Sequence, residues 1–211
     1  MSLLLLYTPV AAQKWTSKCC FYGLEAVSYS PMLPVNNAYK LPESSPDVII
    51  WLSQNAVVHA PQLLSRACRH LAVGPHTASL NSNIEIPTPP YTAEHLLMSL
   101  SQTNQVIWMI GPKQNKSPLD EHIKYIPVYK YEMNQSLPPQ KALTDVIVGS
   151  KKQLTTLLKV QPNYFDTQPH LRIWAHTKDI QKMLPHHPSY LTHAHDIDHT
   201  LQQIQKHLYN A

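Results

Sequence analysis

Short apolar runs rich in β-branched residues alternate with stretches of helical periodicity along most of the chain. Strands separated by helices in this way form parallel sheets whose two faces are covered by the helices. Strands are expected at 3–7, 25–30, 47–52, 70–73, 105–110, 124–132, 145–148, 171–174 and 189–192. Helices are expected at 11–22, from 54 towards 68, at 93–101, 151–160 and 177–184, and in a last segment ending near 208, with short helices after Gly74 and near Leu119. The alternation therefore predicts an α/β protein.

An internal repeat indicates that this pattern is built twice. The segment DVIIWLSQNAV (47–57) is similar to DVIVGSKKQL (145–154), and HLAVGPHT (70–77) is similar to HLRIWAHT (170–177). The two pairs occur in the same order at similar spacing, which chance alone rarely produces. Two related α/β units predict two lobes, with a cleft between them as the expected ligand site.

Four hydroxyl residues, Ser53, Thr77, Ser150 and Thr177, lie where a predicted strand gives way to a predicted helix. At such a position the side-chain hydroxyl and the free N–H groups of the first helical turn point the same way, and together they suit a carboxylate or phosphate. Each residue taken alone is also explained as a plain helix N-cap. Four of them in two matched pairs favour an anion-binding role.

Glycine is scarce, with four residues where average usage gives about 15 in a chain of this length. Gly74, Gly111 and Gly149 each follow an apolar run, and we expect them where a side chain would not fit. Gly23 follows the first helical pattern, as a residue just beyond a helix C-terminus does.

Composition limits the classes of function. The 211 residues carry a net charge of +4, which suits an anionic small molecule, whereas a nucleic-acid-binding protein would show clustered basic residues. The run 3–6 has no cationic segment before it, so neither a signal peptide nor a membrane span is expected, and the cytoplasm is the expected location. The three cysteines include no CxxC pair, which argues against a disulfide framework or a cysteine zinc site.

The segment LTHAHDIDH (191–199) resembles a metallohydrolase zinc motif, H-x-H-x-D-H, but here the spacing is H-x-H-x-x-D-H. The additional residue turns Asp198 and His199 away from His193 and His195, and few residues follow that could complete a zinc site. We therefore expect no metal. Asp196 or Asp198 is expected to cap the last helix instead, with the two earlier histidines adding positive charge near an anionic ligand. His76 and His176 are interpreted as turn residues.

Several motifs together resemble the uroporphyrinogen-III synthase family. The segment DVIIWLSQNAV is similar to the family's D-x-[IV]-[IV]-F-T-S-x-N-A-V, and AVGPHTA (72–78) is similar to VG-x-x-TA. The stretches WMIGPKQNKSPL (108–119) and IPVYKYE (126–132) resemble family segments in the same order, and DVIVGS with AHT (175–177) matches the second serine and threonine. Three positions depart from the family: Thr8 and Ile110 stand where arginine is usual, and Ala175 stands for a glycine.

The resemblance implies two α/β lobes, each with a parallel sheet flanked by helices, joined by a two-stranded linker. One lobe would be discontinuous, from residues 1–33 plus 134–211, and residues 34–133 would form the inserted lobe with its linkers. The proline-containing segments 31–46 and 134–139 lie where such linkers are expected.

The resemblance also implies an activity. The family cyclises linear hydroxymethylbilane, a tetrapyrrole with carboxylate side chains, by inverting ring D through a spiro intermediate and releasing water; it is a hydro-lyase of heme biosynthesis. By this resemblance Tyr129 is the candidate catalytic residue. The candidate substrate-binding residues are Ser53, Asn55, Thr77, Ser150, Lys151 and Thr177.

This chemistry depends on positioning and on stabilising developing charge, so no cofactor and no metal are expected. The expected partner is the small-molecule substrate, with no nucleic acid and no membrane, and the expected state is a monomer. Lys113, Lys116, Lys151 and Lys152 could attract the carboxylates, although each is also explained as a solvated surface lysine. The alternative function is that of a catalytically inactive two-lobed relative that binds an anionic ligand.

Overall fold

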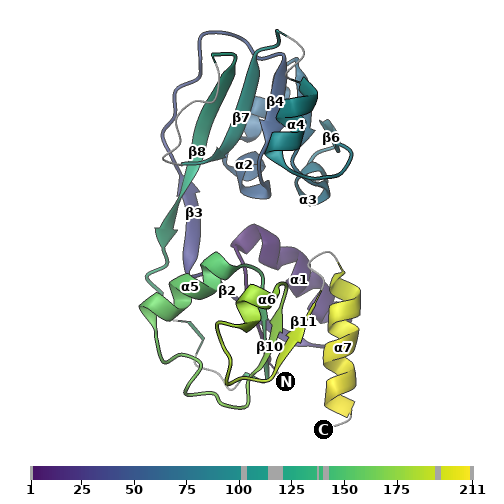
Figure 1. The fold of residues 1–211 in the computed structure, drawn as a ribbon, viewed down its shortest axis with the longest axis vertical. Coiled ribbons are helices and arrows are strands. Elements are labelled where there is room, and N and C mark those ends of the chain that lie inside the picture. Colours follow the sequence, from purple (N-terminus) through teal and green to yellow (C-terminus); the bar gives the residue numbers. More distant parts are fainter. Residues whose placement is uncertain are drawn as a thin grey trace. The chain divides into compact units, whose positions relative to one another are not determined.

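The computed structural model describes residues 2–100, 104–113, 121–136, 138–139, 143–192 and 196–209 (Figure 1). The chain divides into two compact units, one formed by Met1–Leu33 with Met133–Ala211 and the other by Pro34–Glu132. Each unit is an α/β structure with its own sheet, so the predicted fold class is confirmed. The chain passes between the units in β3 (Met32–Asn36) and at the end of β8 (Ile123–Met133), which are neighbouring strands.

The first unit has a five-stranded sheet in the order β11-β10-β9-β1-β2, and all neighbouring strands are parallel. Its elements are β1 (Ser2–Leu6), α1 (Pro9–Phe21), β2 (Glu25–Tyr29), β9 (Asp145–Val148), α5 (Lys151–Val160), β10 (Arg172–Ala175), α6 (Lys178–Gln181), β11 (Ser189–Leu191) and α7 (Ile197–Tyr209). The inner strands β10, β9 and β1 are nearly continuous apolar runs because both faces of the sheet are covered there.

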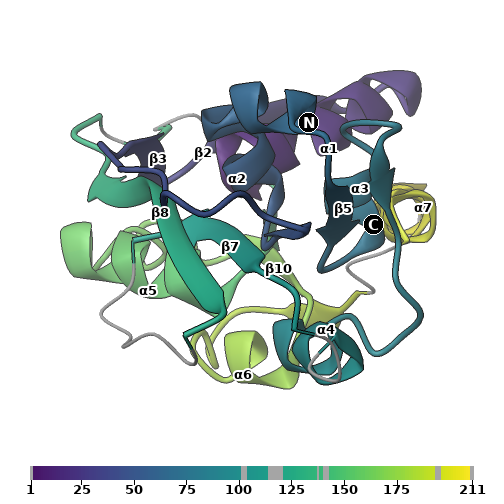
Figure 2. The same cartoon turned by 90° about the horizontal axis from the view of Figure 1, so that it is seen from above.

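The second unit has a six-stranded sheet in the order β3-β8-β7-β4-β5-β6, in which β4 to β8 pair in parallel. Its further elements are β4 (Val48–Trp51), α2 (Gln54–His59), the 3-10 helix η1 (Pro61–Ser65), β5 (Arg69–Ala72), α3 (Pro75–Ala78), β6 (Ile84–Glu85), α4 (Ala93–Leu100) and β7 (Ile107–Pro112). Figure 2 shows β7 and β8 of this sheet from a second direction.

The two sheets have the same strand order once one chain path is circularly permuted. Taken in sheet order, β2-β1-β9-β10-β11 corresponds to β8-β7-β4-β5-β6. When the strands of the first unit are numbered along the chain, this is the doubly wound order 2-1-3-4-5. In the second unit β7 and β8, its last two strands in the sequence, occupy the places that β1 and β2 occupy in the first unit. The internal repeat seen in the sequence therefore corresponds to two sheets of one topology.

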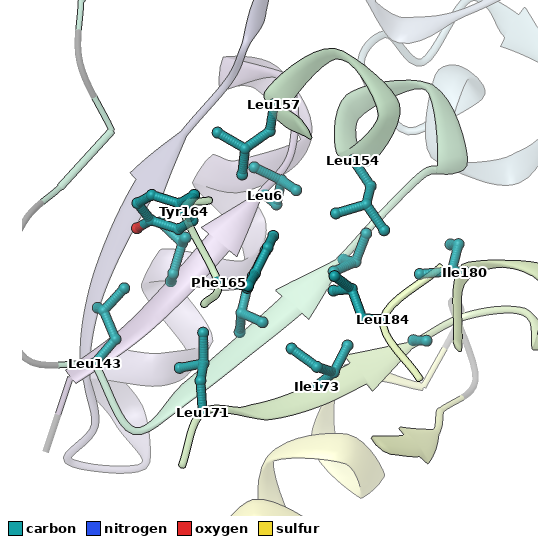
Figure 3. Packing of buried hydrophobic residues seen from close by; sticks show 14 of the residues in the cluster. Leu6, Leu143, Leu154, Leu157, Tyr164, Phe165, Leu171, Ile173, Ile180 and Leu184 are labelled. Atoms are coloured by element: carbon teal, nitrogen blue, oxygen red, sulfur yellow. The ribbon is translucent and has the colours of Figure 1, made fainter. Parts of the chain in front are cut away.

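Apolar side chains from both faces of each sheet form the cores. In the first unit, one face packs against α5, α6 and the segment around Phe165, as Figure 3 shows for Leu154, Leu157 and Ile180. The opposite face packs against α1 and α7 through Trp15 and Leu201. In the second unit, α2, η1 and α3 cover one face and α4 covers the other.

Three details differ from the sequence-based expectation. The helix predicted from 54 towards 68 ends at His59 and continues as η1, because Pro61 lacks the N–H that an α-helix needs there. The helix predicted at 177–184 is reduced to the single turn α6. The linker 31–46 contains the strand β3. The short helix expected near Leu119 lies outside the described residues.

Helix α5 has the predicted bounds, and Gly23 lies just beyond α1 with a φ of +67°, as expected for that position. Within the part of the chain that the structure describes, no helix is long and apolar enough to cross a membrane.

Candidate functional site

Each sheet reverses its winding direction between two central strands, β1 and β9 in the first unit and β7 and β4 in the second. Ligands of open α/β sheets bind beyond the carboxyl ends of such a strand pair. In the first unit these ends lead to Tyr7 and Ser150, and in the second unit the end of β4 leads to Ser53. Residues that bind a ligand are therefore expected at these two edges.

In the second unit Ser53 links a helix cap to the candidate catalytic tyrosine. Ser53 Oγ accepts a hydrogen bond from the backbone N–H of Ala56 at 3.2 Å, and it lies 3.0 Å from Tyr129 Oη. The ring of Tyr129 stacks on His59 with a centroid separation of 5.4 Å. Ser53 therefore caps α2, which is the alternative explanation given for such a hydroxyl, and the structure adds its contact with Tyr129.

Tyr129 is buried, with 1% of its surface exposed. Burial raises the pKa of the Tyr129 phenol well above its ordinary range, although the hydrogen bond with Ser53 lowers it in part. The phenol therefore carries its proton at neutral pH. Ser53 is more exposed than Tyr129, so the serine hydroxyl is the polar group that joins the buried phenol to the edge of the sheet.

Asn55 is 5% exposed, and its amide nitrogen makes a long contact of 3.5 Å with Tyr131 Oη. Its side-chain oxygen has no hydrogen-bond partner among the described residues. A buried amide oxygen without a partner is unusual and suits a site that a ligand or water completes. Asn55 thus lies two residues beyond Ser53 with an acceptor still available.

The position of Thr77 corrects one expectation. The repeat places Thr77 at the start of a helix, but α3 is capped by Gly74, and Thr77 lies inside α3 with 7% of its surface exposed. Counted from the strand ends, Gly74 corresponds to Thr177, because each lies two residues beyond its strand. The similarity between 70–77 and 170–177 is therefore out of register with the structure by three residues.

In the first unit the two predicted caps are present. Ser150 Oγ accepts a hydrogen bond from the N–H of Gln153 at 3.2 Å, and Thr177 Oγ1 accepts one from Ile180 at 3.4 Å. Lys151 is exposed and lies 4.0 Å from Asp179, which connects the first turn of α5 with α6. Such an exposed ion pair holds Lys151 weakly, so its ammonium group can turn to an anionic ligand.

The candidates therefore fall into two groups. Ser53, Asn55 and Tyr129 lie together in the second unit, where Thr77 is part of the core. The group in the first unit consists of Ser150, Lys151 and Thr177, at the starts of α5 and α6. Each group lies within one unit of the fold.

Sequence reasoning did not find Tyr7, which lies at the edge of the first sheet in contact with His176. Gly149 was the available signal, since a glycine directly after a strand can mark a close approach by another group. A Cβ atom at Gly149 would indeed overlap the Tyr7 ring. The expectation that no side chain fits is therefore confirmed at Gly149, and also at Gly111, where a Cβ atom would overlap Leu52 and Tyr125. It is wrong at Gly74, where a Cβ atom would meet only Tyr91 Cβ, at 4.0 Å.

Comparison with solved structures identifies the architecture. No protein-family model matches the sequence, and no curated protein has a significant sequence match. The chain superimposes on the uroporphyrinogen-III synthetase of Helicobacter pylori 26695 with a TM-score of 0.53 and 14% identity, over 90% of this chain and 91% of that one. It superimposes on a mutant uroporphyrinogen III synthase of Thermus thermophilus with a TM-score of 0.56 and 12% identity, over 100% of both chains.

The chain has the fold of the uroporphyrinogen-III synthases. The resemblance inferred from sequence motifs is confirmed at this level. The sequence shares little with either synthase, whereas the α/β architecture matches over 90% of this chain in the first comparison and 100% in the second.

The three departures from the synthase motifs have distinct surroundings in this fold. Ile110 is fully buried in β7 and belongs to the core, so the charge of an arginine would be costly at that position. Thr8 precedes α1 as its N-cap residue but makes no side-chain cap bond. Ala175 ends β10 and is buried. The position of Ile110 is therefore structural in this protein.

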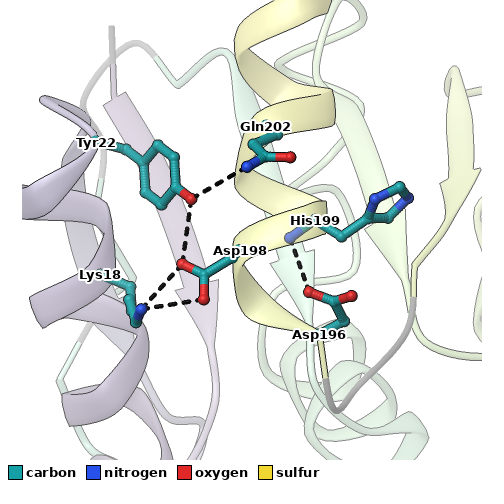
Figure 4. Close-up of polar contacts among 6 residues, drawn as sticks. All are labelled: Lys18, Tyr22, Asp196, Asp198, His199 and Gln202. Atoms are coloured by element: carbon teal, nitrogen blue, oxygen red, sulfur yellow. Dashed lines mark hydrogen bonds and ion pairs between the residues drawn. The ribbon is translucent and has the colours of Figure 1, made fainter.

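The last residues of the segment that resembles a zinc motif, 197–199, begin α7, and Figure 4 shows the contacts of Asp196 and Asp198 there. Asp196 accepts a hydrogen bond from the N–H of His199 at 2.8 Å and caps the helix. Asp198 points the other way, with Lys18 Nζ 3.0 Å from both of its oxygens and Tyr22 Oη at 3.2 Å. Of the two expected caps, Asp196 is the one observed, and Asp198 joins α7 to α1.

His193 and His195 lie outside the described residues. Across the described part of the chain, no group of three or more His, Cys, Asp or Glu residues is placed to hold a metal ion. Lys113 and Lys152 are exposed, and Lys116 lies outside the described residues.

Proposed function

We propose that this protein is a uroporphyrinogen-III synthase, which cyclises hydroxymethylbilane with inversion of ring D through a spiro intermediate and releases water. The observation that carries the proposal is the shared fold with two synthases over nearly the whole of each chain. The motif residues that suggested the family support it, since Ser53 and Ser150 occupy matching positions beyond the central strands of the two sheets.

The chemistry of the two edges suits a substrate with many carboxylates. Ser150 and Thr177 begin helices in the first unit, and Ser53 begins one in the second. Hydroxyl groups and helix N-terminal N–H groups bind carboxylates, and the net charge of +4 favours an anionic substrate. Lys151 adds an exposed ammonium group at the same edge as Ser150.

The bilane closes without an enzyme to the wrong isomer, so the protein has chiefly to hold the chain in the conformation that inverts ring D. Such catalysis comes from positioning and from stabilisation of charge in the transition state. In our proposal the substrate carboxylates bind at Ser53, Asn55, Ser150, Lys151 and Thr177. Thr77 was also predicted to bind substrate, but its burial within α3 fits a packing role better.

Tyr129 is proposed to act on the departing hydroxyl through a hydrogen bond. Its phenol keeps its proton, and Ser53 Oγ, at 3.0 Å, is the hydrogen-bonded link between the buried phenol and the edge of the sheet. The serine hydroxyl accepts from Ala56 and has a proton of its own to donate. Ser53 and Tyr129 therefore act as one hydrogen-bonding unit in the proposed reaction.

The test is to incubate the full chain with freshly generated hydroxymethylbilane, oxidise the products and resolve the type I and type III isomers. We expect type III in excess, with type I alone in a matched incubation with heat-denatured protein. Type I alone from the native protein would overturn the proposed activity. If that protein nevertheless bound the bilane, the result would favour the alternative of an inactive anion-binding relative.

A further inference from the structure

A chain of three polar side chains crosses the carboxyl edge of the first unit's sheet. Tyr7 Oη bonds His176 Nε2, and His176 Nδ1 lies 2.8 Å from Thr192 Oγ1. These residues directly follow β1, β10 and β11, and so they come from positions far apart in the sequence. The chain lies at the edge where Ser150 and Lys151 begin α5.

The contact between Tyr7 and His176 depends on free space at the end of β9. Strand β9 lies between β1 and β10, and Gly149 follows it directly. A Cβ atom on Gly149 would overlap the ring of Tyr7, so the ring crosses the end of β9 where glycine leaves room. Trp15 packs against both rings, at centroid distances of 5.5 Å from Tyr7 and 5.9 Å from His176. A scarce glycine and a buried tryptophan thus hold the two rings in place.

The hydrogen-bond donors and acceptors of this chain permit proton transfer. Burial raises the pKa of the Tyr7 phenol, which therefore keeps its proton at neutral pH. An imidazolium at His176 donates from Nδ1 to Thr192 and from Nε2 to Tyr7, which lets the Tyr7 O–H donate to a ligand. A neutral imidazole instead accepts a hydrogen bond from Tyr7 Oη at Nε2. Thr192, at 4% exposed, is the buried end of this series of hydrogen bonds, while Tyr7 and His176 are only partly buried.

We propose that Tyr7, His176 and Thr192 form a proton relay that protonates the departing hydroxyl of the bilane. This inference rests on the proposed function and adds a proton source to it. Tyr7 suits this role because it is backed by a histidine, the side chain that most readily exchanges a proton near neutral pH.

The relay starts from a protonated His176 and ends with a neutral one. The Oη–H bond of Tyr7 breaks as its proton moves to the hydroxyl oxygen of the bilane, and the C–O bond breaks with its electron pair to release water. The nitrogen lone pair of the pyrrole that carries the hydroxymethyl group forms the new double bond, which gives an azafulvenium cation that keeps its N–H proton. The Nε2 proton of His176 restores the Tyr7 phenol and leaves a neutral imidazole. After ring closure the attacked ring carbon loses a proton, and this proton returns His176 to the imidazolium form.

The decisive experiment compares Tyr7→Phe, His176→Asn and the double variant in the bilane assay. Tyr7→Phe keeps the ring over Gly149 and removes only the hydroxyl. General acid catalysis contributes about 10²–10⁴-fold, so we expect each single variant to lower kcat for type III formation at least about 100-fold with little change in KM. Because residues that act as one unit are not additive, the double variant should lose no more than the worse single variant.

Tyr164→Phe is the matched control. Tyr164 is another buried tyrosine of the first unit, and its hydroxyl donates to the carbonyl of Pro139 at 2.9 Å, away from the relay. It should retain kcat while its unfolding midpoint falls about as much as that of Tyr7→Phe. A wild-type rate in Tyr7→Phe or His176→Asn, or additive losses in the double variant, would overturn the relay and leave the synthase activity standing. Failure of the wild-type protein to form the type III isomer would overturn both.

Discussion

The hydroxyl of Tyr129, on β8, lies 3.0 Å from Ser53 Oγ, the atom that caps α2. This one contact joins the helix cap beyond β4 to a strand on the other side of β7. The serine therefore has two tasks, because it accepts the N–H of Ala56 and holds a buried phenol. Loss of either partner leaves the other with an unmade hydrogen bond in a partly buried place.

We expect Ser53→Ala to lower the free energy of unfolding by about 1–2 kcal/mol, since it removes both the cap and the partner of Tyr129. Tyr129→Phe should cost about 1 kcal/mol. Urea unfolding of both single variants and the double variant measures the coupling, expected at about 0.5–1.5 kcal/mol. Strictly additive effects would show that the contact contributes nothing. In the bilane assay both variants should slow type III formation.

Gly149→Ala should destabilise the first unit by about 1–3 kcal/mol, because the added methyl group overlaps the Tyr7 ring, which is held by Trp15 and His176. Gly74→Ala is the control, since its Cβ would meet only Tyr91 Cβ, at 4.0 Å. It should cost less than about 1 kcal/mol, as a change of N-cap residue does. Thermal unfolding measures both. In a Tyr7→Ala background the penalty of Gly149→Ala should disappear, and its persistence there would contradict the proposed overlap.

Asp145→Asn should be the most destabilising of these changes. The carboxylate is 0% exposed and accepts from Arg172 Nη2 and Trp174 Nε1, each at 2.8 Å. Removing one partner of a buried ion pair costs about 3–5 kcal/mol, and here the guanidinium left behind, that of Arg172, is 17% exposed. The exposed pair of Arg69 and Glu85 provides the control, and Glu85→Gln should cost at most about 1 kcal/mol. Equal losses in chemical denaturation would refute the distinction between the two pairs.

The ion pair of Asp198 makes a prediction about pH. The hydrogen bond from Lys18 lowers the pKa of Asp198 below its ordinary value of 3.8, and Tyr22 acts in the same direction. A lowered pKa in the folded state means that the pair stabilises the fold above about pH 4, and that this stabilisation is lost as the pH falls through the folded pKa. An NMR titration should therefore show Lys18→Met returning the pKa of Asp198 towards 3.8. An unchanged value would rule out Lys18 as the cause.

Much of the fold was predictable because its signals are local. Helix α5 was predicted with its observed bounds, since its apolar residues recur at helical spacing after a serine cap. The central strands were recognised as buried apolar runs. The two-residue strand β6 was not predicted, because so short a segment carries no periodicity. The helix that was predicted across Pro61 shows that a breaker outweighs a favourable pattern.

The candidate site was predictable in part. The positions of Ser53, Ser150 and Thr177 at helix starts were predictable, because a helix cap is determined within a few residues. Thr77 was placed wrongly, since a similarity of letters between two segments does not fix which residues end their strands. Tyr7 was overlooked, because its partner His176 is 169 residues away in the sequence.

The sequence by itself determined the α/β class, the duplication of the unit and the motifs that indicate a synthase, because periodicity and caps act over a few residues. Only the tertiary structure decided that Tyr7 meets His176 and that Tyr129 meets Ser53. The first contact joins the ends of β1 and β10, and the second joins the end of β4 to Tyr129, which lies within β8 beside the last residue of β7. The order of the strands follows from packing apolar faces over the whole unit, which no local stretch of the chain encodes.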